Sequence, residues 1–516
     1  MMAEKQIYQL QTLPGFDRDS SVWNAKHYTD GQWVRFQRGL PRKMGGYQEI
    51  SPNIGGLVRG AYLTTTNGAI YSYGFAQNKC YLSRLGPTMS GAPAGESELD
   101  AGLANSDLYT FQTDAIYDAT GGGTSTILVH PAANISDIAA TSATKIYSAT
   151  LGSSPPTWAA IEDGLGNDLT CTGGVVVLQP FVFIYGENGL IKNSNQNDPN
   201  DWQIAATKDA NEVNVAANKI VKGLAMRGSG SSPAGLFWSL DSLIRVTYVG
   251  GSKGFRYDTL SNQTSVMSPH GIIEYDGMYF WIGSDRFMMF DGQVKELPNK
   301  QNFNWFFDGV NYAQRTKIWA MKVPRFGEIW WFFPKDGATE CTHAIIFNVR
   351  EGTWYDTEIA RSSGSQVQVA PNPVAYSTDT NRLGSYSLFA HERGVDASRD
   401  GASVALQSNF TTNEFGFPTG GADGDKPVGL DLWTRLVRVE PDITQEGDMS
   451  MNVLGREYAQ DSDTVSANYD VPVACDKIDV REHHRNLRLK FESNTVGGAY
   501  QIGRITVHTE PGDRRS

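Results

Sequence analysis

A short unit of β-prone runs and tight turns recurs along most of this sequence, and it constrains the fold more than any other feature. The clearest copy covers residues 272–297, where Asp276-Gly277 and Asp291-Gly292 separate apolar runs. Asp-Gly favours a two-residue hairpin because both residues adopt positive φ at little cost. The four runs are Ile272–Tyr275, Met278–Ile282, Phe287–Phe290 and Gln293–Leu297. We therefore expect one small antiparallel sheet in this segment.

Comparable units recur at a nearly constant spacing. They start at residues 175, 224, 272, 318 and 374, so that consecutive starts are 49, 48, 46 and 56 residues apart. A period of about 40–50 residues with four strands per unit is typical of a β-propeller. We expect the tryptophans to pack between neighbouring blades, because one blade cannot bury its aromatic faces alone. These tryptophans are Trp238, Trp281, Trp319, Trp330 and Trp331.

The predicted fold is therefore all-β, with a propeller of about six blades. Its first unit is expected at 57–85 and the remaining units at 171–416. Residues 86–170 interrupt the pattern with a segment rich in Ala, Gly, Ser and Thr, and its short β-prone pieces predict an inserted small β-domain.

The inserted segment also carries most of the negative charge. Lys145 is its single basic residue against ten carboxylates, a local charge of −9 out of −12 for the whole chain. A merely solvated surface and a surface with an electrostatic role both remain open. The carboxylates are Glu96, Glu98, Asp100, Asp107, Asp114, Asp118, Asp137, Glu162, Asp163 and Asp168.

The C-terminal region follows a different pattern. Residues 417–429 form a linker rich in Gly, Pro and Asp, and beyond it apolar and polar residues alternate in 449–453 and 487–491. Strict alternation predicts strands of sheets that bury one face. We expect a terminal, β-sandwich-like domain at 430–516 and little helix outside residues 300–310.

Charge and motifs argue against most enzymes and against DNA-gripping proteins. A net charge of −12 is unsuited to the neutralisation of phosphates. The sequence holds no P-loop and no H-E-x-x-H signature, and its histidines lack zinc spacing. Gly250–Gly254 matches G-x-S-x-G, but β-prone runs flank it on both sides, where a nucleophile elbow needs a following helix. We expect no enzyme activity, no metal and no cofactor.

Segments at both ends of the chain resemble a known family. Gly31–Phe36 reads GQWVRF and Gly39–Tyr47 reads GLPRKMGGY, while Arg485–Asn494 reads RNLRLKFESN. Together with the Asp-Gly turns of the central unit, this pairing resembles the tail nozzle proteins of short-tailed bacteriophages, also called tail tubular or stabilisation proteins. The resemblance covers the termini and the propeller, and it leaves out 86–170.

The resemblance implies a structural virion protein that forms a hexameric nozzle below the head-to-tail adaptor. The nozzle would be a conduit for genomic double-stranded DNA during ejection, without sequence-specific binding. Expected partners are further copies of the chain, the adaptor, a tail fibre or spike and, transiently, the bacterial envelope. The protein would be made in the host cytoplasm and reside in the virion tail. The alternative is a β-propeller tail protein that binds or hydrolyses glycans.

Within this family arrangement, residues 1–56 are an N-terminal arm that joins the C-terminal domain in a platform. Segment 86–170 is expected at the nozzle tip or facing the lumen, where its ten carboxylates would oppose adhesion of DNA phosphates. The residues expected at a subunit or adaptor interface are Trp33, Arg35, Phe36, Arg42, Lys43, Arg485, Arg488 and Lys490.

Overall fold

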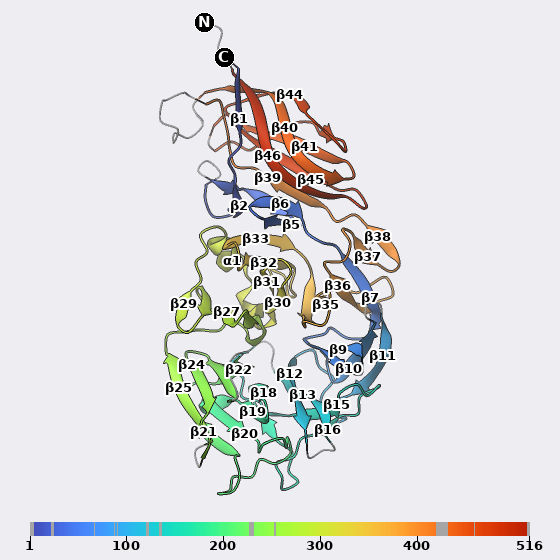
Figure 1. Cartoon of the computed structure of the whole chain (residues 1–516), viewed down its shortest axis with the longest axis vertical. Coiled ribbons are helices and arrows are strands. Elements are labelled where there is room, and N and C mark those ends of the chain that lie inside the picture. Colours follow the sequence, from blue (N-terminus) through green and yellow to red (C-terminus); the bar gives the residue numbers. More distant parts are fainter. Residues whose placement is uncertain are drawn as a thin grey trace.

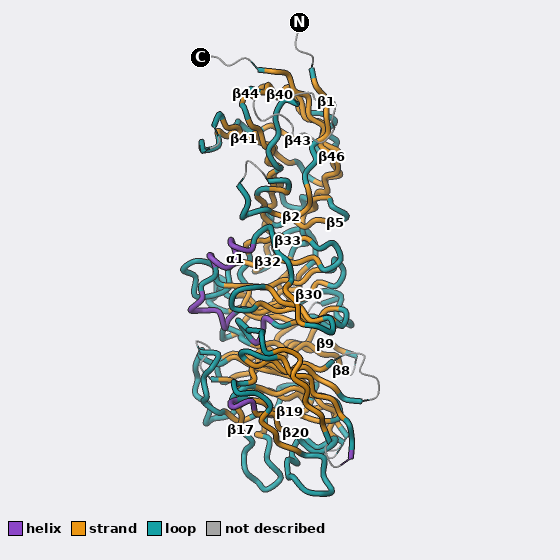
Figure 2. Tube along the Cα trace, turned by 90° about the vertical axis from the view of Figure 1, so that its left-hand side faces the viewer, coloured by secondary structure: helices purple, strands orange, loops and turns teal. Residues whose placement is uncertain are grey.

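The protein is all-β, as its sequence predicts, with 53% of its residues in strands and 4% in helices. The computed structural model describes residues 5–512 apart from 22–24, 67, 87, 90, 120–122, 134–136, 227–231, 252–253, 419–431 and 459. Most of the predicted linker therefore lies outside the described residues. No helix in the described part of the chain is long and apolar enough to cross a membrane. The chain is elongated, and both termini lie at one end (Figures 1 and 2).

In the described residues, the middle of the chain forms seven successive sheets, which we call the sheet array (Figure 1). Sheet 1 holds β8 (Gly60–Thr66), β9 (Ala69–Ala76), β10 (Lys79–Leu85) and β11 (Gly91–Glu98). Sheet 2 holds β12 (Thr110–Asp118), β13 (Thr124–Ala132), β15 (Tyr147–Thr150) and β16 (Ala159–Ala160). Sheet 3 holds β18 (Gly174–Leu178), β19 (Phe181–Tyr185), β20 (Leu190–Asn193) and β21 (Asn211–Asn214). Sheet 4 holds β22 (Ile220–Ala225), β23 (Ala234–Ser239), β24 (Leu243–Tyr248) and β25 (Phe255–Ser261).

The array continues with three further sheets. Sheet 5 holds β26 (Ile273–Tyr275), β27 (Met278–Ile282), β28 (Phe287–Phe290) and β29 (Val294–Glu296), followed by helix α1 (Phe303–Gly309). Sheet 6 holds β30 (Trp319–Val323), β31 (Glu328–Phe333), β32 (His343–Asn348) and β33 (Thr353–Glu358). Sheet 7 holds β34 (Arg361–Ser365), β35 (Val374–Ser377), β36 (Tyr386–His391), β7 (Tyr47–Ile54), β37 (Ala397–Arg399) and β38 (Ala402–Val404). A short pair, β14 (Thr144–Lys145) and β17 (Thr170–Cys171), lies beside sheet 2.

The first strands of these sheets contact one another in chain order. β8 contacts β12, β12 contacts β18, β18 contacts β22, β26 contacts β30, and β30 contacts β34. Sheets 4 and 5 meet where the Tyr279 hydroxyl donates a hydrogen bond of 3.0 Å to the Ala225 carbonyl oxygen. β34 in turn contacts β8, so the last sheet returns to the first. β7, from the N-terminal arm, supplies a strand of sheet 7 by pairing with β36.

Aromatic side chains fill the spaces between adjacent sheets. Trp238 and Trp281 are fully buried and meet edge to face, 5.8 Å apart, between sheets 4 and 5. The other three predicted core tryptophans are also buried. Asp276 and Gly277 have φ of 50° and 80°, as their two-residue hairpin requires.

Residues 86–170 differ from the separate domain that the sequence suggests. β11 pairs with β10 along its whole length, and therefore completes sheet 1. Phe111 of sheet 2 stacks on Phe75 of sheet 1 at 5.6 Å, within one shared apolar cluster. The segment is poor in large apolar residues, but the few it has, such as Ile127 and Val129, are buried with sheet 1. Sheet 2 is thus a member of the array.

Sheet 2 also holds a buried histidine that makes stability sensitive to pH. His130 on β13 is fully buried, and burial lowers its pKa from 6.5 to about 4. Its Nε2 lies 3.1 Å from the Cys171 carbonyl oxygen and 2.8 Å from Thr144 Oγ1, whereas Nδ1 has no hydrogen-bond partner among the described residues. Protonation of Nδ1 would place an unpaired charge in the core.

We expect His130 to destabilise the fold on acidification. The unfolded chain takes up the proton near pH 6.5 and the folded chain only near pH 4, so stability falls across that window by up to about 3 kcal/mol from this residue. Urea unfolding at pH 7 and pH 4.5 should show a smaller loss of stability for His130→Gln than for the wild type. His483→Gln, at a half-buried position in the C-terminal region, is the control and should follow the wild type. Equal losses in all three proteins would contradict the assignment.

Strands from both chain ends form two further sheets, which we call the terminal lobe (Figure 1). One holds β1 (Gln6–Gln9), β5 (Val34–Gln37), β6 (Leu40–Lys43), β40 (Thr434–Glu446), β44 (Ile478–His484) and β46 (Ala499–Pro511). The other holds β4 (Asp30–Gln32), β39 (Ser408–Thr411), β41 (Met449–Arg456), β42 (Thr464–Val465), β43 (Tyr469–Val471) and β45 (Asn486–Ser493). β2 (Leu13–Phe16) and β3 (His27–Tyr28) form a short parallel pair beside them. The N-terminal arm is thus divided, since β1–β6 lie in the lobe or beside it and β7 lies in the array.

Candidate functional site at the lobe junction

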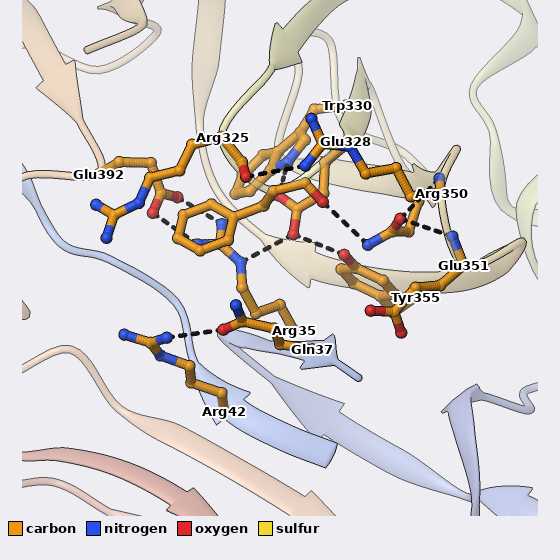
Figure 3. Close-up of polar contacts among 12 residues, drawn as sticks. Arg35, Gln37, Arg42, Arg325, Glu328, Trp330, Arg350, Glu351, Tyr355 and Glu392 are labelled. Atoms are coloured by element: carbon orange, nitrogen blue, oxygen red, sulfur yellow. Dashed lines mark hydrogen bonds and ion pairs between the residues drawn. The ribbon is translucent and has the colours of Figure 1, made fainter. Parts of the chain in front are cut away.

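A buried arginine joins the terminal lobe to the sheet array (Figure 3). Arg35 on β5 is 1% exposed. Its Nε and Nη2 donate to the two carboxylate oxygens of Glu328 at 2.8 and 3.0 Å. Its Nη1 and Nη2 also donate to the two oxygens of Glu392 at 2.7 and 2.6 Å. One guanidinium thus makes two bidentate pairs, the geometry in which arginine binds carboxylates most strongly.

Glu328 is saturated with donors, which explains how a carboxylate stands at the start of a buried strand. Besides Arg35, it accepts hydrogen bonds from the Trp330 indole at 2.8 Å and from the Tyr355 hydroxyl at 2.7 Å. The Phe326 ring lies 3.6 Å from the guanidinium carbon of Arg35 and covers it. Because its hydrogen-bonding capacity is met in one geometry, this network fixes the position of β5 on sheet 6.

The Arg35 guanidinium stays charged despite its burial. Burial opposes the charge on Arg35, but Glu328 and Glu392 outweigh that effect and raise the pKa of the guanidinium. An ion network of this kind is costly to desolvate, and removing one member leaves the others buried without compensation. The junction therefore tolerates changes at Arg35 poorly.

Other residues of the arm reinforce the same contact. Arg18 makes a bidentate pair with Asp356 on β33, with distances of 3.1 and 2.9 Å, and also pairs with Asp30. The side-chain amide of Gln32 donates to the Glu358 carbonyl oxygen at 3.1 Å and accepts from the Glu358 N–H at 3.0 Å. The arm thus binds β33 of sheet 6 at several points beyond the buried network.

Apolar packing is continuous across the junction. Trp33 and Phe36 of the arm share one buried cluster with Trp330 and Ile346 of sheet 6 and with Leu489 of the terminal lobe. The backbone N–H of Trp33 also donates a hydrogen bond of 3.1 Å to Thr357 Oγ1. The terminal lobe and sheet 6 are therefore one packed unit.

The structure corrects the expected interface. Trp33, Arg35, Phe36, Lys43 and Arg488 are all buried inside the chain, so contacts with another chain require other residues. Their charges are used internally, and none of these side chains is available on the surface. Three members of the expected set, Arg42, Arg485 and Lys490, are half-exposed.

The other two buried cations, Lys43 and Arg488, have partners within the terminal lobe. Lys43 Nζ donates to the Gly498 carbonyl oxygen at 2.7 Å, and burial lowers the pKa of this lysine. Arg488 pairs with Asp463 and donates to Thr29 Oγ1 at 3.1 Å. These contacts bind the N-terminal arm to the C-terminal strands.

The ten expected lumen carboxylates do not share one environment. Asp100, Asp114 and Asp163 are half-buried and Asp118 is buried. Asp114 accepts a hydrogen bond from the Val177 N–H at 2.8 Å, and burial raises its pKa to about 6. The remaining six are exposed: Glu96, Glu98, Asp107, Asp137, Glu162 and Asp168.

Sequence reasoning missed Glu328, Glu392 and Tyr355. Glu328 could have been predicted from one feature of the sequence. It is the first residue of the otherwise apolar strand Glu328–Phe333, and a carboxylate buried there needs a cation beside it. No sequence feature pointed to Glu392, because it is 357 residues from Arg35 and lies in a turn.

No protein-family model and no curated protein matches the sequence. Among the described residues, no group of three or more His, Cys, Asp or Glu side chains is placed to hold a metal ion.

Proposed function

We propose that this chain is a structural subunit of the tail nozzle of a short-tailed bacteriophage. Six copies would form a conduit for double-stranded DNA, attached to the head-to-tail adaptor and in contact with a tail fibre or spike. The bacterial envelope would be met transiently at ejection. In this proposal the terminal lobe is the platform that meets the adaptor, and the sheet array forms the body of each subunit.

A seven-bladed β-propeller is the fold that we propose for the sheet array. The cyclic contact order of the first strands supports it, as does the strand that the N-terminal arm adds to sheet 7. Pairing β7, which precedes sheet 1 in the chain, with β36 of sheet 7 would close a ring without a free edge between the first and last blades. This proposal counts one blade more than the sequence suggests, because sheet 2 replaces the inserted domain.

The observation that carries the functional proposal is the way both chain ends are built into one lobe and fixed to the array. β46 pairs with β1, β6 and β40, so a single strand joins both ends of the chain. The Arg35 network then fixes that lobe to sheet 6. A conduit subunit has to transmit load between the adaptor and the tip, and a junction without a flexible hinge suits that task.

Exposed negative charge on sheets 1 and 2 supports a DNA conduit. Glu96 and Glu98 lie on the edge strand β11, and Glu162 and Asp168 flank the loop that follows β16. Trp158 Nε1 donates to Ser97 Oγ at 3.0 Å and brings these segments together. We call these four carboxylates the acidic sector. Exposed carboxylates close to the duplex repel phosphates and keep DNA from adhering.

Charge reversal in the acidic sector tests this proposal. Changing its four residues to lysine should slow DNA ejection in vitro by about threefold or more at low salt, with recovery at about 0.5 M salt, because lysines attract phosphates and salt screens them. The present ion pairs of the sector are exposed and contribute little to stability, so the fold should survive. DNA ejected from purified particles is measured by the fluorescence of a DNA-binding dye.

The matched control changes four exposed carboxylates in another part of the sheet array. Asp276, Asp285, Asp308 and Asp336 lie in sheets 5 and 6 and the segments beside them, and their replacement by lysine alters the net charge equally. These particles should eject DNA at the wild-type rate. Equal ejection rates for both variants and the wild type, in particles of normal composition, would contradict the acidic-conduit proposal.

A further inference from the structure

A polar groove of about 340 Å³ opens at the junction between the terminal lobe and sheet 6. One wall comes from the lobe strands β4, β39 and β45, with Gln32, Asn409 and Lys490. The other comes from α1 and from β32 and β33, with Trp305 and Glu358. Its volume lies in the range of small-ligand pockets, about 300–1,000 Å³.

The groove contains one unpartnered buried amide. Asn409 is 8% exposed, and in the described part of the chain its side chain makes no hydrogen bond. Its amide oxygen and nitrogen are not sealed from solvent, so they open into the groove and can form several hydrogen bonds there. Its neighbour Gln32, directly opposite on β4, by contrast makes two hydrogen bonds with the Glu358 backbone. Asn409 is therefore free to bind a ligand that brings both donors and acceptors.

The groove also presents an aromatic face and a free carboxylate. Trp305 is half-exposed and stacks edge to face with Phe333, which fixes its ring. Arg18 Cζ and Lys335 Nζ both lie over the indole, 5.8 and 5.3 Å from its ring centroid. The Glu358 carboxylate is exposed and makes no ion pair with a described residue. Planar amide and carboxylate groups beside an indole match the alternating hydroxyl and C–H surfaces of a pyranose ring.

The charges that line the groove balance. Arg18, Lys335 and Lys490 contribute three cations, and Asp30, Asp356 and Glu358 contribute three anions. His343 adds no charge at neutral pH, because burial lowers its pKa. A phosphate or a nucleic acid would need a clear excess of cations. The balance instead favours a ligand that is polar and uncharged.

We propose that this groove binds a neutral saccharide, with Trp305 stacking on a sugar ring and with Asn409 and Glu358 holding its hydroxyl groups. The binding is non-covalent and involves no bond cleavage. The site lies within one chain and does not depend on the assembly of a nozzle. It gives the tail protein a contact with glycan in addition to its structural role.

The test uses the full chain on an array of neutral glucose, galactose, mannose and N-acetylglucosamine oligomers. Sulfated and phosphorylated oligomers of equal length are printed beside them. We expect binding to at least one neutral oligomer, with weaker binding to its charged counterpart. Trp305→Ala should weaken the binding about tenfold, through loss of the aromatic contact. Asn409→Ala and Glu358→Ala test the polar contacts and do not require removal of a packed ring.

Trp433→Ala is the matched control, since this half-buried tryptophan lies in the terminal lobe and does not line the groove. It should bind the array as the wild type does. The proposal is overturned if no neutral oligomer binds, if charged oligomers bind better, or if Asn409→Ala and Glu358→Ala leave binding unchanged. A failure here would not affect the conduit proposal, which is measured by DNA ejection.

Discussion

Replacing Trp281 with alanine is expected to lower the free energy of unfolding by about 3–5 kcal/mol. The ring is fully buried between sheets 4 and 5, and its indole N–H donates to the Ser265 carbonyl oxygen at 3.0 Å. The substitution leaves a cavity against Trp238 and removes the hydrogen-bond donor to the half-buried Ser265 carbonyl group. Urea unfolding followed by circular dichroism measures the loss.

Trp158→Ala provides the comparison for this prediction. Trp158 is half-exposed and lies at the margin of the cluster between sheets 1 and 2. Trp158→Ala should lower the free energy of unfolding by clearly less than Trp281→Ala does. Equal losses for the two variants, or a loss below about 1 kcal/mol for Trp281→Ala, would contradict the packing of sheet 4 against sheet 5.

Arg35→Met should be destabilising by a similar amount, about 3–5 kcal/mol, for an electrostatic reason. Methionine fills much of the space of the arginine stem, but it leaves Glu328 and Glu392 buried without their cation. The amides of β5 and β31 should then exchange hydrogen faster, because the arm loses its fixed place on sheet 6. Hydrogen exchange read by mass spectrometry, with urea unfolding alongside, gives both quantities.

Two further variants separate charge from packing at this position. Arg38→Met, in the exposed turn that follows β5, should change stability by less than about 0.5 kcal/mol. Arg35→Met combined with Glu328→Gln and Glu392→Gln should recover part of the loss, since no uncompensated carboxylate remains. If the triple variant were no more stable than Arg35→Met, the loss would come from packing and the electrostatic account would be wrong.

Local sequence signals were sufficient for the strands of sheet 5. Met278–Ile282 and Phe287–Phe290 are strands with the predicted bounds, and the other two predicted runs each contain a strand. They are apolar runs bounded by turn residues, so chain-local chemistry decides where each one starts and stops. The short helix is also local, with α1 lying inside the predicted 300–310.

Sheet 2 and the pairing of β7 with sheet 7 could not be predicted from local sequence. β12 mixes Asp114 and Asp118 with polar and apolar residues, and its burial depends on sheets 1 and 3 beside it. β7 pairs with β36, more than 300 residues away, and no local pattern specifies that partner. Both features are decided by tertiary contacts, which a single sequence does not contain.

The terminal basic residues show the same limit at the candidate site. Arginine is usually exposed, so Arg35 and Arg488 read as surface charges available to another chain. Glu328 and Glu392 meet Arg35 only when the N-terminal arm packs on the sheet array, and Asp463 meets Arg488 only when the terminal lobe is folded. The residue types thus pointed to an ion-pair site, but its location inside the chain depended on the fold.

A cryo-electron microscopy reconstruction of the virion tail tests the nozzle assignment most directly. The account predicts six copies of this chain around a central DNA channel, with the terminal lobes against the head-to-tail adaptor and the sheet arrays further from the head. Particles that lack this chain, or that carry it only as a peripheral appendage away from the DNA path, would contradict the assignment.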